Sequence, residues 1–143
     1  MAKVEDERDR VMRSVSVASE GRVLLGGHDS DLRRALGSAI RADGCEVIEV
    51  SGGVLLLGQV EFSLSAVGPR PRLVVVMTDM GLTGLEVLGI LDHIYREIPV
   101  IFVTASGSER IMLQARRLGA SGVFAAPVDV DVLQGAIRAA MSR

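Results

Sequence analysis

The chain has 143 residues, 48% of them hydrophobic and 24% charged, which is typical of a single folded domain with a buried core. A net charge of −2 and only 3% aromatic residues argue against nucleic acid as a partner, because binding it needs a clustered basic face or stacking aromatics. No apolar run reaches the roughly 18 residues that span a bilayer, and the charged N-terminus lacks a signal-peptide core, so we expect a cytoplasmic protein without membrane contact.

The first 21 residues differ from the rest and are assigned as an N-terminal extension, residues 1–21, ahead of one domain at residues 22–143. Charges of both signs alternate from Lys3 to Arg13. Three valines recur at spacings of seven and four residues, namely Val4, Val11 and Val15. This spacing would place them on one stripe of a short amphipathic helix. A helix of this length is marginal in water, so the extension either frays or docks on the domain or a second subunit.

The domain begins with an apolar run at residues 23–25, which predicts a strand that ends at two glycines. Either Asp29 or Ser30 then caps a helix, because both side chains accept hydrogen bonds from the amides of a first helical turn. Apolar residues recur every four positions in this helix, at Leu32, Leu36 and Ile40. Gly44 is suited to end the helix, and residues 46–50 form a partly alternating second strand.

Residues 51–53 turn the chain into a second helix, which extends to about Ser65. Residues 73–77 are all apolar and mostly β-branched, as in a strand of a parallel sheet that is buried on both faces. Thr83 and Glu86 then form a capping box at the start of a third helix over 85–95.

The remaining segments repeat the alternation of strand and helix. Strands are predicted at 99–103 and 122–124, and helices at 110–118 and 130–141. Ser106 and Glu109 form a second capping box, Gly119 closes the helix that follows, and Asp129 caps the last helix. Five strand–helix units in succession predict an α/β fold, with a doubly wound parallel sheet covered by helices on both faces.

Four segments, in this order and at this spacing, carry a resemblance to a known family. They are Asp-Leu-Arg-Arg-Ala-Leu at 31–36, Gly-Leu-Thr-Gly-Leu-Glu-Val-Leu at 81–88, Ile-Pro-Val-Ile-Phe-Val-Thr-Ala at 98–105 and Gly-Ala-Ser-Gly-Val-Phe-Ala-Ala-Pro at 119–127. Together they resemble the receiver domain of bacterial response regulators, the modules of two-component signalling. The resemblance implies a flavodoxin-like sheet of five parallel strands in the order 2-1-3-4-5, with five helices.

A receiver of this family takes a phosphoryl group from a phosphohistidine onto an aspartate at the end of its third strand. Mg²⁺ neutralises the phosphoryl oxygens and is held mainly by an acidic pair at the end of the first strand. A lysine and a hydroxyl group contact the phosphoryl group from the neighbouring strands.

Most of this set is missing when it is carried onto the chain. The acidic pair falls on Gly27 and His28, with Asp29 one position too late. The phosphoacceptor falls on Val76 when counted back from Gly84, or on Met77 when counted forward from Pro71. The nearest carboxylate, Asp79, is displaced from either position by two or three residues.

The other positions are altered too. The lysine falls on Ala126, and Lys3 is the only lysine in the chain. The hydroxyl is kept as Thr104, whereas the aromatic-switch position falls on Val123, with Phe124 beside it. Glycine and imidazole leave Mg²⁺ short of the oxygen ligands that it prefers, so we expect weak or absent Mg²⁺ binding and no other cofactor. Because such a constellation works as a unit, its loss predicts a degenerate receiver, without enzymatic activity, that is not phosphorylated on aspartate.

This degenerate receiver is expected to act through protein–protein interaction, with a sensor kinase or an output protein as the partner. The family's usual surface is its fourth helix, fifth strand and fifth helix, here residues 106–141. The candidate polar contacts on this surface, each of which is otherwise a solvated side chain, are Arg110, Arg116, Arg117 and Arg138. A homodimer stays open.

Two alternatives stay open as well. The first is a ligand- or metal-responsive switch in the modified pocket, for which His28, Asp29 and Asp79 offer one imidazole and two carboxylates. The second is an atypical receiver that accepts the phosphoryl group on Asp79.

Overall fold

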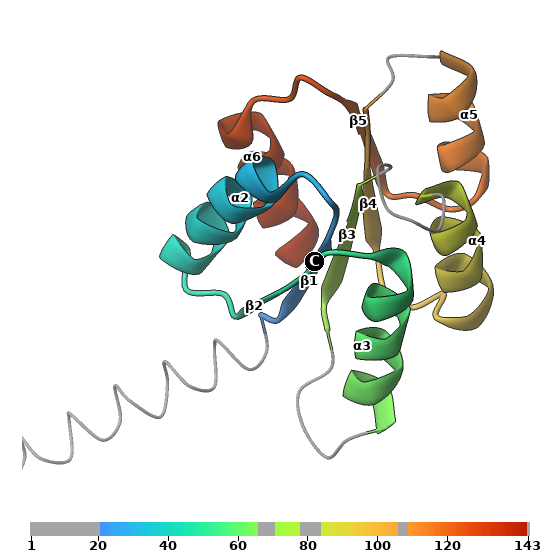
Figure 1. The fold of residues 1–143 in the computed structure, drawn as a ribbon, viewed down its shortest axis with the longest axis horizontal. Coiled ribbons are helices and arrows are strands. Elements are labelled where there is room, and N and C mark those ends of the chain that lie inside the picture. The colour runs from blue at the N-terminus through green and yellow to red at the C-terminus, as the bar shows by residue number, and fades with distance from the viewer. Residues whose placement is uncertain (1–20, 66–70, 78–83, 106–108, 143) are drawn as a thin grey trace, which may run out of the picture.

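The computed structural model describes residues 21–65, 71–77, 84–105 and 109–142, and these form the predicted α/β fold (Figure 1). All five strands are parallel, and they lie in the order β2-β1-β3-β4-β5. The strands are β1 (Val23–Gly26), β2 (Val47–Val50), β3 (Leu73–Met77), β4 (Val100–Thr104) and β5 (Gly122–Ala125). The predicted strand order is therefore confirmed.

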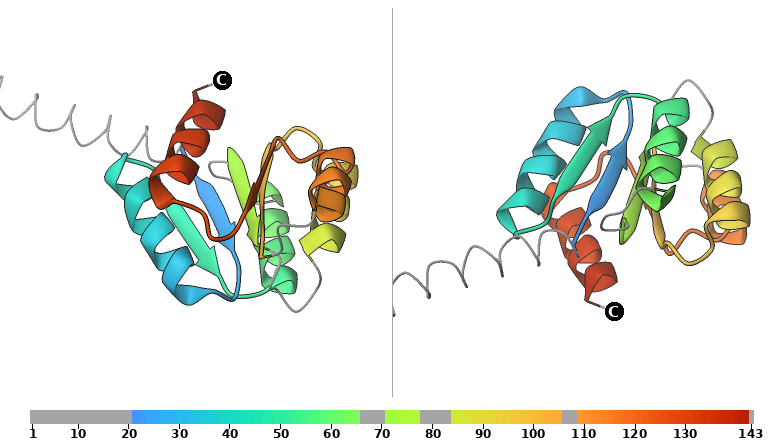
Figure 2. Two further views of the ribbon diagram at one scale, coloured as in Figure 1. Left: turned by 90° about the horizontal axis from the view of Figure 1, so that it is seen from above. Right: turned by 90° about the horizontal axis from the view of Figure 1, so that it is seen from below.

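Five helices cover the two faces of the sheet. They are α2 (Ser30–Ala42), α3 (Gly53–Ser65), α4 (Gly84–Ile94), α5 (Glu109–Arg117) and α6 (Val130–Met141). Figures 1 and 2 show α2 and α6 together on one face and α3, α4 and α5 on the other. Crossovers between parallel strands are right-handed, so the direction in which the chain moves along the sheet decides the face on which the connecting helix lies. The crossover from β1 to β2 moves one way and the three later crossovers move the other way, which puts α2 opposite α3, α4 and α5.

The middle of the sheet is buried on both faces. Successive residues of β3 point to opposite faces, so Val74 and Val76 join the core under α3–α5 while Val75 and Met77 join the core under α2 and α6. Every residue of β1, β3 and β4 is buried. The unbroken apolar run at 73–77 is thus explained by a strand that has no solvent-facing side.

Two aspartates begin helices, and for α2 the capping residue is Asp29 rather than Ser30, the other candidate. The Asp29 carboxylate accepts a hydrogen bond from the Leu32 amide at 3.1 Å, and the Asp129 carboxylate accepts one from the Asp131 amide at 2.9 Å. Each bond satisfies an amide that has no partner inside the first helical turn. The α2 helix therefore starts directly after β1 and brings its first turn to the carboxyl end of the sheet.

Two glycines end helices in the left-handed backbone region that favours glycine, with φ of +89° at Gly44 and +96° at Gly119. Of the residues in the predicted capping boxes, Thr83 and Ser106 lie outside the described residues. Residues 1–20 of the extension lie outside them as well. Within the described part of the chain, no helix has the length and apolar character that crossing a membrane requires.

Candidate functional site

The site positions meet at the carboxyl ends of the central strands. The sheet register pairs Gly26 with Val76, so Gly27 and Met77 follow side by side at the ends of β1 and β3. Gly27 is buried, and Met77 is only 3% exposed. The ends of parallel strands are where this class of fold holds its ligands.

The Met77 side chain fills the space beside Gly27. A β-carbon added at position 27 would come within 2.6 Å of the Met77 sulfur, 2.7 Å of its Cβ and 2.9 Å of its Cγ. These separations are far below the van der Waals contact distance of about 3.5–4.0 Å between carbon atoms. An acidic side chain at position 27 therefore has no room unless Met77 or the backbone moves.

His28 and Asp29 lie on the solvent side of this strand end, and both are exposed. The Asp29 carboxylate is used as the cap of α2, where it accepts from the Leu32 amide. In the part of the chain that the structure describes, no three His, Cys, Asp or Glu side chains come together as metal ligands. Asp79 lies outside the described residues, so the predicted grouping of His28, Asp29 and Asp79 stays a prediction.

A cationic side chain that the sequence reasoning missed reaches the same strand end. Arg33, one turn into α2, donates a hydrogen bond from Nη1 to the Gly27 carbonyl oxygen. Its Nε lies 3.4 Å from Glu49 Oε1 on β2, and the second Glu49 oxygen accepts from Arg41 at 2.9 Å. No sequence signal marks this contact, because only the fold brings α2, β1 and β2 together at one corner.

The predicted hydroxyl position, Thr104, and the predicted lysine position, Ala126, are neighbours. Thr104, the last residue of β4, is 1% exposed, and its carbonyl accepts from the Ala126 amide at 2.7 Å. This hydrogen bond holds residue 126, an alanine, at the end of β4. The peptide bond that follows, between Ala126 and Pro127, is cis.

The aromatic side chain beside the switch position points to the opposite face of the sheet. Val123 belongs to the core under α3–α5, whereas Phe124 packs with the core under α2 and α6. This is the ordinary alternation along a strand. At position 123 there is thus a valine, and the neighbouring ring faces away from it.

Val76 and Met77 differ in their surroundings. Val76 is fully buried in the core under α3–α5, and Met77 is the last residue of β3. Met77 supplies the three atoms nearest to a β-carbon built at position 27.

The chain matches the family model "Response regulator receiver domain" over residues 23–138. It is also 27% identical over 118 residues to sporulation initiation phosphotransferase F of Bacillus subtilis (strain 168). The aligned region covers 82% of this chain and 90% of that protein. The match to the family model spans β1 through most of α6.

Solved structures show the same fold. A CheY-like response regulator receiver domain protein from Methanospirillum hungatei JF-1 superposes with a TM-score of 0.77 at 18% identity, covering 87% of this chain and 95% of that one. Chemotaxis response regulator CheY4 of Vibrio cholerae superposes with a TM-score of 0.73 at 19% identity, covering 84% and 98%. The flavodoxin-like fold is thereby confirmed, and the chain belongs to the response regulator receiver domain family.

Proposed function

We propose that this chain is a receiver module of two-component signalling that works without phosphorylation on aspartate and without catalysis. The observation that carries the proposal is the contact between Met77 and Gly27, where the first atoms of an acidic side chain would overlap the methionine. A receiver site needs an open, oxygen-rich cavity at this strand end. Here the two strand ends pack against each other through a thioether.

Electrostatics supports the same conclusion. The Arg33 guanidinium is hydrogen-bonded to the Gly27 carbonyl, so a cation already lies beside this strand end and uses one of its oxygen acceptors. Like charges at such short range repel strongly in a partly buried site. Asp29, the acid two residues after Gly27, is held by its capping bond at the start of α2. Mg²⁺ binding is therefore weak or absent in this proposal.

Position 77 is the better equivalent of the phosphoacceptor than position 76. Met77 ends β3 and lies next to the strand end of β1, while the Val76 side chain points into the core under α3–α5. An aspartate at position 76 would be buried among apolar side chains, at a large desolvation cost. An aspartate at position 77 would face the site.

The proposed interaction surface lies on α5. Leu113 is 51% exposed, and Arg110, Arg116 and Arg117 stand three or four residues from it on the same helix, all exposed. An exposed leucine ringed by arginines suits a partner surface that is apolar at its centre and acidic at its rim. Such a partner is a sensor kinase or an output protein of the signalling system.

Arg138 does not belong to this surface. Its guanidinium binds the Asp43 carboxylate at 2.6 and 2.8 Å, so it points toward the end of α2. The proposed contacts are therefore the three arginines of α5 with Leu113.

The test is to treat the full chain with a phosphoryl mimic and with a phosphoryl donor. With Mg²⁺ and beryllofluoride, we expect no chemical-shift change at His28, Thr104 or Ala126, and with acetyl phosphate we expect no mass increase. A saturable, Mg²⁺-dependent change would overturn the proposal. If Asp79→Asn abolished such a change, Asp79 would be identified as an atypical phosphoacceptor.

The ligand-switch alternative has its own readout. A thermal-shift screen of divalent metals and small anions is expected to leave the melting temperature of the wild type unchanged. A stabilising ligand whose effect is lost in His28→Ala would favour the switch.

A further inference from the structure

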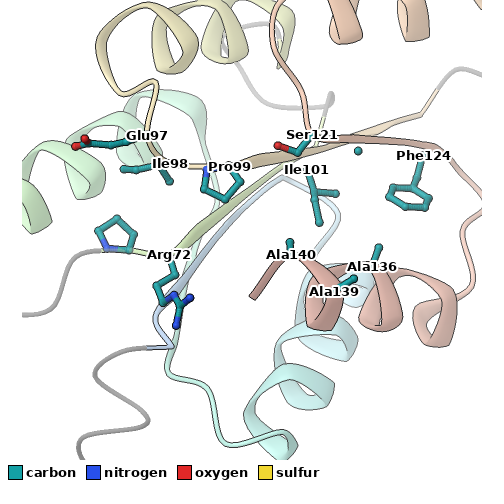
Figure 3. Close-up of a pocket in the computed structure, with 12 residues that line it drawn as sticks. Arg72, Glu97, Ile98, Pro99, Ile101, Ser121, Phe124, Ala136, Ala139 and Ala140 are labelled. Atoms are coloured by element: carbon teal, nitrogen blue, oxygen red, sulfur yellow. The ribbon is translucent and has the colours of Figure 1, made fainter. Parts of the chain in front are cut away.

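A pocket of about 580 Å³ lies at the end of the sheet opposite the site positions, between α6 and the strands β4 and β5. Figure 3 shows Ile101 and Phe124 on its strand side, facing Ala136, Ala139 and Ala140 of α6. The three alanines and Gly122 explain the space, because a larger side chain at these positions would fill it. The pocket is of a size that accommodates several apolar side chains.

The domain's first residues lie at the mouth of this pocket. The Arg72 amide donates a hydrogen bond to the Arg22 carbonyl at 2.9 Å, and Arg72 also lines the pocket (Figure 3). Gly21 is buried just before β1. The preceding residues therefore join the domain at the same end of the sheet as this apolar pocket, the end at which the strands begin.

The extension has the length and pattern to occupy the pocket. A helix from residue 3 to residue 15 would be about 20 Å long, and the six residues from 16 to 21 reach up to about 20 Å when extended. Val4, Val11 and Val15 fall on one stripe of such a helix, with Glu7 and Arg8 on its two borders.

Two charged side chains of opposite sign lie on the pocket rim. Arg72 and Glu97 are both exposed and both line the pocket. Glu7 and Arg8 on the extension are their complements in charge. The extension also precedes the family match, which begins at residue 23, so it is an addition to the shared domain.

We infer that the N-terminal extension docks as a helix on its own domain, with its valine stripe in the pocket between α6 and the β4–β5 edge. Burying the stripe supplies the partner that so short a helix needs in water. Docking would tie the extension to α6.

The test is nuclear Overhauser contact between methyl groups in the full chain. We expect contacts from Val11 or Val15 to Ala139 and Ala140, and their loss in Val11→Asp/Val15→Asp. Arg13→Asp changes charge on the opposite side of the helix and is expected to keep the contacts. Ala139→Trp places a ring in the pocket from an exposed position and is expected to remove them without unfolding the domain.

Anilinonaphthalene sulfonate, an apolar fluorescent probe, gives a second readout. Its fluorescence is expected to rise severalfold in Val11→Asp/Val15→Asp, because the pocket is vacated, and to stay at the wild-type level in Arg13→Asp. Equal probe binding by all three proteins, or random-coil shifts for residues 4–15, would overturn the inference. Contacts seen only between isotope-labelled and unlabelled chains would also overturn it, since they would mean docking between two copies.

Discussion

Met77 and Gly27 are packed so closely that a β-carbon on the glycine would lie 2.6 Å from the methionine sulfur. The identities of the two residues are therefore coupled through space, although about fifty positions separate them in sequence. An acidic side chain introduced at position 27 alone would overlap Met77. This coupling makes the packing of the two strand ends measurable.

We expect Gly27→Ala to destabilise the domain by roughly 1–3 kcal/mol, because the added methyl group overlaps Met77 in a buried site. The cost should nearly vanish in a Met77→Gly background, where the overlapping atoms are gone. Urea unfolding of the four proteins of this double-mutant cycle measures the coupling, which we expect at roughly 0.5–3 kcal/mol. Additive effects of the two substitutions would contradict the packing described here.

The fold was predictable because each element carries a local signal. Asp29 and Asp129 mark helix starts, Gly44 and Gly119 mark helix ends, and the unbroken apolar run at 73–77 marks a strand buried on both faces. These signals act within a few residues, so reading the sequence recovers them. The order of the strands then followed from the family resemblance.

The contents of the site were predictable only in part. The sequence shows which residues stand at the expected site positions, but not that Met77 fills the space beside Gly27, because this depends on the register of β1 against β3. The bond from Arg33 to Gly27 also depends on how α2 sits against the sheet. Arg138 was expected on the partner surface, and its bond to Asp43 crosses 95 positions that no local pattern links.

Asp29 is expected to act as a helix cap rather than as a metal ligand. Asp29→Ala should lower the free energy of unfolding by about 1 kcal/mol, because the Leu32 amide loses its acceptor. Asp29→Ser should recover most of this loss, since a serine hydroxyl also accepts the bond. Thermal unfolding with and without Mg²⁺ measures both effects. A Mg²⁺ response present in the wild type and lost in Asp29→Ser would show a ligand role instead.

The Asp43 carboxylate at the end of α2 should make stability depend on acid pH. Arg138 and then Gln134 donate hydrogen bonds to it and lower its pKa from 3.8 to about 2. Because the folded pKa is lowered, the stabilisation is present above the unfolded value and is lost as pH falls through about 2.

Urea midpoints of the wild type and Asp43→Asn test this dependence. The wild type should be the more stable at neutral pH, and the difference should shrink as the pH falls from about 4 to about 2. Asp31→Asn, which changes an exposed acid in the first turn of the same helix, serves as the control. A difference between wild type and Asp43→Asn that does not change with pH would contradict the pKa assignment.

Substitutions on the α5 surface should weaken partner binding without lowering the stability of the domain. Leu113→Asp, or Arg116→Glu with Arg117→Glu, should reduce affinity for the kinase or output protein at least about tenfold, because the apolar centre or the basic rim is lost. The melting temperature should hardly change, since these side chains are exposed. Arg34→Glu on α2, on the other face of the sheet, is the matched control. If that control weakens binding as much as the α5 variants do, the partner binds elsewhere.

Restoring the missing groups together should create a Mg²⁺ site. In Gly27→Asp/His28→Asp/Met77→Asp/Ala126→Lys, removing Met77 opens the space that the new carboxylate at position 27 must occupy, and the three introduced carboxylates repel one another until a cation binds. We expect millimolar Mg²⁺ to raise the melting temperature of this variant by several degrees and to leave the wild type unchanged. The same variant with Met77 retained should be less stable and unresponsive, because methionine and aspartate compete for one space. A wild type that responds to Mg²⁺ as strongly as the fourfold variant would show that the native pocket already holds the ion.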